Sequence, residues 1–580
     1  MRCDGGVFLP DGRVYELVGY LPKGTPEGPE FESAVICRCG YGCVNRNPLS
    51  TIETTLRLPL NRCDMQAEDP AQNVTAQGGV VAGMTLLSRI SGFGRDMVLA
   101  NFFGASEVAD AFFVAFRIPN FFRRLFAEGA FNQAFVPVLI RYKARTVAEL
   151  RLFVAVVAGN LTVVLLFVVI AGVLLAPGLV AVFAPGFLGD AERFALTTDM
   201  VRITFPYLGF ISLTAFAGAL QNSHHRYAIP AFTPVLLNLT LISAMLFAAD
   251  LFTNPVFALA WGVFAAGLVQ LLFQFPSIRR LNLVVTPRVS ARHEGAKQVG
   301  RLLVPAVLAA SVSQINTLID TILASTLLTG SISWLYYSDR LMELPIGLVA
   351  VALGTVLLPN LSRLDAAGER EKFSASLDWG LRLGMLLGLP AAMALYVLAV
   401  PLISTIYLRG ALTELDARMA ALSLQAFSFG VVALVMVKVL APAYFARQDT
   451  QTPFRIGAIA VATNVVLNLA LFSWFGHVGL ALATAVAAWV NALLLLFGLQ
   501  RRALYQPGRK LGVGLARAVL ATAGMGAMLF WWIPTDNAWL HAADATRIFW
   551  LGEAVLLGSF CYLTVLFLLG ERPKNLLLRV

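Results

Sequence analysis

Long apolar runs separated by short polar breaks follow one another from residue 78 to the end of the chain. A helix needs about twenty apolar residues to cross the ~30 Å hydrocarbon core of a bilayer. The pattern predicts fourteen such helices, at 78–101, 108–139, 151–176, 196–220, 230–249, 256–276, 300–327, 332–358, 377–405, 417–445, 453–474, 478–499, 512–533 and 547–569. It therefore indicates an all-α polytopic membrane protein.

The charges of the connecting loops predict how these helices are oriented. Lys and Arg concentrate in the connections 141–151, 279–301 and 500–517, each of which follows an even-numbered helix, whereas connections after odd-numbered helices are neutral, acidic or mixed. Basic residues accumulate in short cytoplasmic loops. We therefore expect both termini to be cytoplasmic, which agrees with an even number of helices.

A faint internal repeat divides the helices into two sets of six. FVPVLIRY and LLPNLSRL align Pro137 with Pro359 and Arg141 with Arg363, at an offset of 222 residues. Because the offset spans six helices, the two halves have the same orientation, a plan that transporters use around a central cavity. The predicted parts are an N-lobe at 73–280, a C-lobe at 281–500 and two additional helices at 501–580.

Residues 1–72 differ from the remainder of the chain. They hold five of the six cysteines, contain no run of spanning length, and carry seven basic against ten acidic residues. The spacing of Cys37, Cys39 and Cys43 matches no common zinc pattern. We expect an unstructured extension, or a translation start assigned too far upstream, with Met65 and Met84 as internal candidates.

Composition narrows the function further. Hydrophobic residues make up 58% of the chain and charged residues 13%, where a soluble domain is roughly a quarter charged. A soluble enzyme is excluded. A membrane enzyme is disfavoured too, because only His293 and His541 of the five histidines have a carboxylate close in sequence, and both lie in predicted loops.

Several charged residues fall inside predicted spanning helices, where an Arg costs roughly 2.5 to 3.5 kcal/mol. They are Arg89, Arg95, Asp96, Asp110, Arg117, Arg123, Arg124, Glu128, Asp339, Arg340, Glu343 and Lys438. Three explanations stay open: structural ion pairs, most applicable to the aspartates; snorkelling near helix ends; or a cavity for an anion. Arg outnumbers Lys here, and the planar guanidinium suits phosphate. A phosphate-bearing substrate is the sharpest hypothesis.

A second polar set has a different character. It consists of Asp320, Asn464, Asn468 and Thr484, which lie within three predicted helices. One carboxylate with neutral oxygens suits Na⁺, and a buried Asp would also suit proton exchange. Hydrogen bonds between helices explain the Asn and Thr residues equally well.

Three long blocks carry a resemblance to a known family. SRISGFGRDMVLANFFGASEVADAFFVAFRIPNFFRRLFAEGAFNQAFVPVL (88–139), SISWLYYSDRLMELPIGLVAVALGTVLLP (331–359) and VKVLAPAYFARQDTQTP (437–453) resemble the MurJ/MviN family of lipid II flippases, within the MOP transporter superfamily. The likeness covers about 73–580. It implies fourteen helices, with two six-helix lobes and two further helices that form a groove for the lipid tail.

The resemblance also implies roles for particular residues. The family's cavity arginines and their acidic companions fall on Arg89, Arg95, Arg123, Arg124, Arg340, Asp110, Glu128 and Asp339. One departure is Arg117, where the family often has Lys, so the charge is kept.

The expected function is therefore transport without catalysis. The substrate would be lipid II, an undecaprenyl-pyrophosphate-linked peptidoglycan precursor, moved from the cytoplasmic to the periplasmic leaflet of the bacterial inner membrane by alternating access. We expect no cofactor other than a coupling Na⁺ or H⁺, and no nucleic acid. Partners would be membrane lipids and the cell-wall synthesis machinery. The alternatives are an exporter of another polyprenyl-linked glycan and a MATE-like drug/ion antiporter.

Overall fold

The computed structural model describes the backbone of residues 7–8, 14–23, 30–38, 41–45, 70–126 and 130–571. It describes side chains from residue 79 onward, except for 125–130, 308–313, 350–352, 355 and 572–580. The chain forms two compact units, residues 1–70 and 71–580.

The N-terminal unit contains a small antiparallel sheet. Its strands are β1 (Val7–Phe8), β2 (Val14–Lys23), β3 (Glu30–Arg38) and β4 (Tyr41–Asn45), and they pair in chain order. This differs from the unstructured extension that the sequence suggested. A search for long apolar runs misses short strands, although β2 is rich in the β-branched and aromatic residues that favour them.

The second unit is helical throughout its described residues. Its helices are α1 (Pro70–Phe103), α2 (Glu107–Phe126), α3 (Ala130–Lys143), α4 (Val147–Leu174), α5 (Ala176–Phe183), α6 (Ala191–Thr204), α7 (Tyr207–Asn222), α8 (Ala228–Phe247), α9 (Val256–Arg280), α10 (Glu294–Ser325), α11 (Ser331–Ala366), α12 (Arg370–Val397), α13 (Ala399–Tyr407), α14 (Glu414–Ala446), α15 (Gln451–Arg501), α16 (Arg509–Trp532), α17 (Asp536–His541) and α18 (Asp544–Leu568). Two short 3-10 helices, η1 (Pro185–Gly189) and η2 (Ala249–Leu251), cap turns.

All fourteen predicted segments lie on these helices, which confirms the all-α membrane architecture. Three predicted helices are divided: 108–139 into α2 and α3, 196–220 into α6 and α7, and 377–405 into α12 and α13. Two others run together as α15, bent where Gly476 adopts φ 56°. Within the described part of the chain, nine segments are long and apolar enough to cross a membrane.

The internal repeat is visible in the helix boundaries. α4 and α12 are both 28 residues long and lie 223 residues apart at each end. The same shift takes the starts of α5, α6 and α8 to the starts of α13, α14 and α15. The two halves therefore follow one plan, and α16 to α18 fall outside it.

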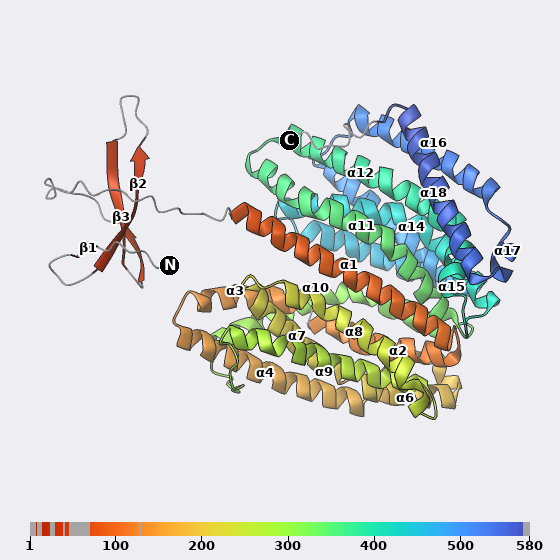
Figure 1. Ribbon diagram of the computed structural model, residues 1–580, viewed down its shortest axis with the longest axis horizontal. Helices are drawn as coiled ribbons and strands as arrows, with labels where there is room; N and C mark the ends of the chain where they lie inside the picture. Colours follow the sequence, from red (N-terminus) through yellow and green to blue (C-terminus); the bar gives the residue numbers. More distant parts are fainter. Residues whose placement is uncertain are drawn as a thin grey trace. The chain divides into compact units, whose positions relative to one another are not determined.

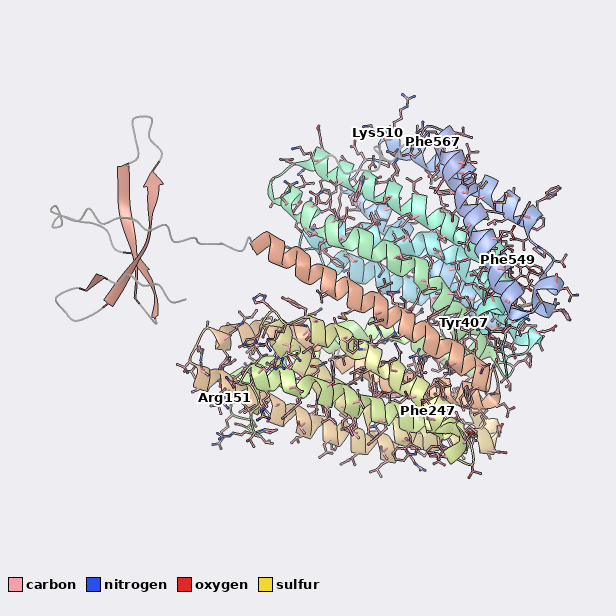
Figure 2. The ribbon with its side chains drawn as sticks, in the orientation of Figure 1. Arg151, Phe247, Tyr407, Lys510, Phe549 and Phe567 are labelled. Carbon is pink, nitrogen blue, oxygen red and sulfur yellow. The ribbon has the colours of Figure 1, made fainter. Side chains whose placement is uncertain are left out.

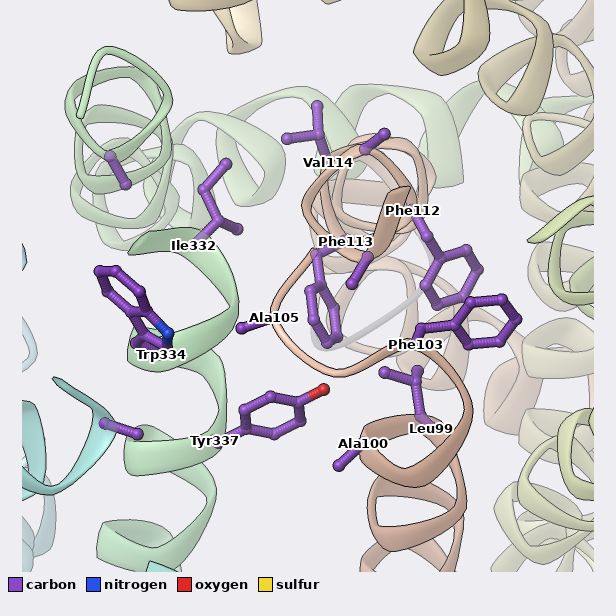
Figure 3. Packing of buried hydrophobic residues seen from close by; sticks show 14 of the residues in the cluster. Leu99, Ala100, Phe103, Ala105, Phe112, Phe113, Val114, Ile332, Trp334 and Tyr337 are labelled. Atoms are coloured by element: carbon purple, nitrogen blue, oxygen red, sulfur yellow. The ribbon is translucent and has the colours of Figure 1, made fainter. Parts of the chain in front are cut away.

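The two lobes lie side by side, with α1 running along the junction (Figure 1). At one end of that junction the lobes share a buried core, where Phe103 of α1 and Phe113 of α2 lie close to Tyr337 of α11 (Figure 3). The Phe113 and Tyr337 ring centroids are 5.9 Å apart and nearly perpendicular, a favourable aromatic geometry. This packing seals one end of the junction.

The last long helices cover one side of the C-lobe. Met525 of α16 and Ala554 of α18 are buried with Leu386 of α12, and the Tyr562 hydroxyl donates a hydrogen bond to the Leu386 carbonyl at 2.7 Å. Their outer faces carry exposed apolar side chains such as Phe549 and Phe567 (Figure 2). Such faces suit contact with lipid acyl chains.

Candidate substrate and ion sites

A buried ion network joins the two lobes about two turns before the end of α1. Arg95 and Asp96 are 4% and 1% exposed, and Arg95 Nη2 donates to Asp96 Oδ1 at 2.6 Å. The same guanidinium donates to Asn238 Oδ1 of α8 at 3.2 Å and to the Tyr336 hydroxyl of α11 at 2.7 Å. Because the Arg95 charge is shared among three partners, its position is tightly fixed.

Arg340 completes this network from the C-lobe. Its Nε lies 3.0 Å from Asp96 Oδ2, and its Nη1 lies 3.4 Å from Glu343 Oε2. The guanidinium also sits over the Tyr336 ring, 5.3 Å from the centroid. Unlike Arg95, the Arg340 side chain is 36% exposed. It therefore ties the lobes together and remains accessible to an anion.

Arg89 lies two helical turns from Asp96, on the same face of α1. A Cβ placed on Gly347 of α11 would lie 2.2 Å from Arg89 Nη1. Asp96 meets α11 at Arg340, seven residues before Gly347. Arg89 and Asp96, seven residues apart, therefore face α11 from the same side of α1. The guanidinium of the exposed Arg89 lies close to Gly347.

Asp110 lies apart from this network. Its Oδ2 accepts from Arg193 Nη2 at 2.9 Å and from the Gly330 amide at 2.8 Å, and its Oδ1 accepts from the Ser333 amide and hydroxyl at 2.9 and 2.5 Å. These donors include two orphan amides at the start of α11. Asp110 thus caps a helix of the opposite lobe, a geometry that favours the structural ion-pair explanation.

The remaining charges of α2 and α3 are distributed along the junction. Arg117 Nη1 donates to Thr321 Oγ1 of α10 at 2.8 Å, and Asp339 lies within electrostatic reach of it. Arg123 Nε donates to Asn120 Oδ1 at 2.9 Å. Arg124 is exposed. Glu128, the other acidic residue predicted here, lies outside the described residues.

The four residues of the predicted ion set form a continuous chain of hydrogen bonds. Asn468 Nδ2 donates to Asp320 Oδ1 at 2.6 Å and to Asn464 Oδ1 at 2.7 Å, and Asn464 Nδ2 donates to Thr484 Oγ1 at 3.1 Å. Both asparagines are fully buried. Within the described residues, Asn468 Oδ1 has no hydrogen-bond partner. An oxygen left unpaired beside a carboxylate fits a monovalent cation.

Sequence reasoning missed three residues that hold these sites in place. Asn238 bridges Arg95 to the Ser91 hydroxyl, Tyr336 receives two arginines, and Arg193 neutralises Asp110. The available signals were an Asn inside the apolar run of α8 and a Tyr within the 331–359 block. Arg193 lies in a predicted loop, and a charged residue in a loop gives no sign of a buried partner.

Comparisons with known proteins agree with this geometry. Residues 99–549 match the family model described as Lipid II flippase MurJ. A probable lipid II flippase MurJ of Haemophilus influenzae is 43% identical over 508 residues, covering 85% of this chain and 99% of the relative. The lipid II flippase MurJ of Burkholderia cenocepacia is 39% identical over 500 residues, covering 84% and 96%.

Solved structures give the same assignment. A structure of lipid II flippase MurJ in an inward closed conformation superposes with a TM-score of 0.71 at 26% identity, covering 84% of this chain and 97% of that one. An inward-facing MATE transporter of the MOP superfamily gives a TM-score of 0.59 at 14% identity, which speaks for the fold alone. The chain is a multi-pass membrane protein and belongs to the MurJ family of lipid II flippases.

Proposed function

We propose that this protein moves lipid II from the cytoplasmic to the periplasmic leaflet of the inner membrane by alternating access. The observation that carries the proposal is Arg340. It is bound to Asp96 of the opposite lobe, yet more than a third of its side chain is open. A guanidinium in that position can exchange Asp96 for a pyrophosphate, since both present two negatively charged oxygens to the same donor fork.

Contacts between the lobes support a state closed at one end. The Ala411 amide donates to the Asn101 carbonyl at 2.9 Å, and the Tyr337 hydroxyl donates to the Gly104 carbonyl at 2.8 Å. Both lie at the end of α1, the first beside the connection from α13 to α14 and the second beside the start of α11, on the side that the loop charges predict to be periplasmic. The headgroup would then enter from the cytoplasmic side, beside Arg89 and Arg340, while the polyprenyl tail stays in lipid along α16 and α18.

A leaflet assay tests this function. Arg340→Ala should cause lipid II to accumulate in the cytoplasmic leaflet when it replaces the normal protein, because one guanidinium is lost while Arg95 still neutralises Asp96. Arg288→Ala, an exposed cation of the linker before α10, is the control and should flip normally. Normal flipping by a well-inserted Arg340→Ala protein contradicts the proposal. Unchanged leaflet distribution with altered drug tolerance favours an exporter.

We further propose that a cation at Asp320 couples to the cycle. The hydrogen-bonded chain from Asp320 to Thr484 offers one negative charge and neutral oxygens, which suits Na⁺, and the carboxylate alone would suit H⁺. Flipping in proteoliposomes should depend on an imposed Na⁺ or H⁺ gradient in the normal protein and not in Asp320→Asn. Equal gradient dependence in both proteins would exclude this site.

A further inference from the structure

A hollow of about 390 Å³ lies between the end of α3 and the first turns of α10. Arg141, Tyr142 and Arg145 line it from the α3 side. Its other wall carries Lys297, Gln298 and Arg301 of α10. None of these residues belongs to the substrate or ion sites described above, so the hollow is a separate feature of the molecule.

The hollow gathers charges that are far apart in the sequence. Its two basic walls come from two different connections, 141–151 and 279–301, and four cationic side chains line it. Glu294 lies 3.7 Å from Lys297, and Glu149 lies 3.3 Å from Arg145. Among the described residues, neither Arg141 nor Arg301 has an ion-pair partner. Basic loop residues that only set the orientation of the protein in the membrane do not need to gather around one concave surface.

The floor of the hollow is rigid. The Tyr142 ring stacks on Phe153 with centroids 4.3 Å apart and an 8° interplanar angle, and the Arg145 guanidinium lies 4.8 Å above the Tyr142 ring. Gly295 permits this packing, because a Cβ there would lie 2.7 Å from the Tyr142 ring. The first turn of α10 therefore reaches the hollow, and the partial positive charge of a helix N-terminus adds to that of the side chains.

Apolar side chains flank the charged walls. Ile140 of α3 is 57% exposed, and Leu302 and Val304 of α10 are 41% and 62% exposed. A basic pocket bordered by exposed apolar residues is typical of sites that bind lipid headgroups at the cytoplasmic membrane surface.

We propose that this hollow binds a phosphate ester, with the headgroup of an anionic phospholipid as one source and a soluble phosphate compound as the other. The phosphate would lie among Arg141, Arg145, Lys297 and Arg301. A bound headgroup would bridge α3 of the N-lobe and α10, the first helix of the C-lobe, which also packs against α15. The site does not include the central arginines, so this proposal can be tested separately from lipid II transport.

The test uses the full chain in nanodiscs of phosphatidylcholine containing about one fifth phosphatidylglycerol. Retained phosphatidylglycerol is measured by native mass spectrometry after transfer to detergent. Arg141→Gln combined with Arg301→Gln should weaken retention about twenty-five-fold, since each basic residue near a membrane surface contributes roughly fivefold. The matched control, Arg288→Gln with Arg292→Gln, removes two exposed arginines from the same cytoplasmic side and should leave retention unchanged.

A second arm separates the two sources. Inorganic pyrophosphate is titrated against both double variants and the normal protein in pure phosphatidylcholine nanodiscs. Retention of lipid without pyrophosphate binding identifies a headgroup site, and pyrophosphate binding that only the Arg141/Arg301 variant loses identifies a soluble phosphate site. Equal loss in the pocket variant and the control overturns the proposal. Unchanged thermal unfolding of both variants shows that any loss is local.

Discussion

The two lobes carry an aspartate at corresponding positions, and the two aspartates have opposite surroundings. Asp96 in α1 and Asp320 in α10 both stand eleven residues before the start of the following helix. Each receives help from an asparagine of the fifth helix of its repeat: Asn238 supports Arg95, and Asn468 donates directly to Asp320. Asp96 is paired with two arginines, whereas the hydrogen-bond donor to Asp320 is a neutral amide.

The arginines of the second helices cross between the lobes. Arg117 and Arg340 lie 223 residues apart, the offset of the repeat. Arg340 of the C-lobe reaches Asp96 of the N-lobe, and Arg117 of the N-lobe bonds Thr321, the neighbour of Asp320, in the C-lobe. The same repeated pattern thus places an aspartate beside two arginines in the N-lobe and an aspartate beside a neutral amide in the C-lobe.

The largest predicted effect comes from disrupting the ion network in which Asp96 pairs with two arginines. Asp96→Asn leaves Arg95 and Arg340 without their shared acid, and removing one partner of a buried pair costs 3 to 5 kcal/mol. We expect the free energy of unfolding in detergent to fall by about 3 kcal/mol. Glu343→Gln, which removes a half-exposed partner of Arg340, is the control and should cost less than about 1 kcal/mol. Equal effects would show that Asp96 does not organise the network.

At Asp320, whose hydrogen-bond donor is a neutral amide, we expect a substitution to change the response to cations more than the stability of the fold. Asp320→Asn keeps an oxygen for Asn468, so unfolding in the absence of Na⁺ should change little. In the normal protein, Na⁺ at a hundred times its Kd should stabilise the fold by about 2.7 kcal/mol. The variant should lose that gain. This stabilisation is measured by comparing thermal unfolding in NaCl with thermal unfolding in choline chloride. If NaCl stabilises the variant as much as the normal protein, there is no Na⁺ site at Asp320.

Arg117 sharpens the comparison because it places a positive charge near the proposed cation site. Arg117→Gln should strengthen Na⁺ binding about tenfold, since two cations separated by roughly 8 to 16 Å repel each other by about 1 to 2 kcal/mol at an effective dielectric constant of about 20. Arg117→Lys keeps the charge and should leave affinity near normal. Sodium titrations of thermal stability distinguish the two, and identical affinities in both variants would exclude electrostatic tuning.

Sequence alone predicted the features that local pattern determines. Apolar runs located the long helices, although not the breaks that divide 108–139, 196–220 and 377–405. The ion set was predicted because an intramembrane Asp is costly enough to require partners. The cross-lobe pairs were not predictable, because Arg340 and Asp96 meet only through packing between repeats. For the same reason the pattern could not show that Asp110, which the family resemblance places among the cavity residues, caps α11. Nor did the two basic loops show that they converge on one hollow.

The smallest predicted effect comes from a partly exposed ion pair, Asp449 with Arg502, on the side that the loop charges predict to be cytoplasmic. Hydrogen bonds from Thr452 and from Arg502 lower the pKa of Asp449 from its usual value to about 2. Because the folded-state pKa lies below the unfolded one, the pair stabilises the protein above about pH 4 and the contribution is lost as pH falls from there towards 2. The Asp449 side chain is a quarter exposed, so solvent screening should keep the contribution below about 1 kcal/mol. Asp449→Asn should therefore reduce only slightly the loss in the free energy of unfolding as the pH falls from about 4 to 2. A loss as large as that of Asp96→Asn would mean that exposure does not separate these two classes of ion pair.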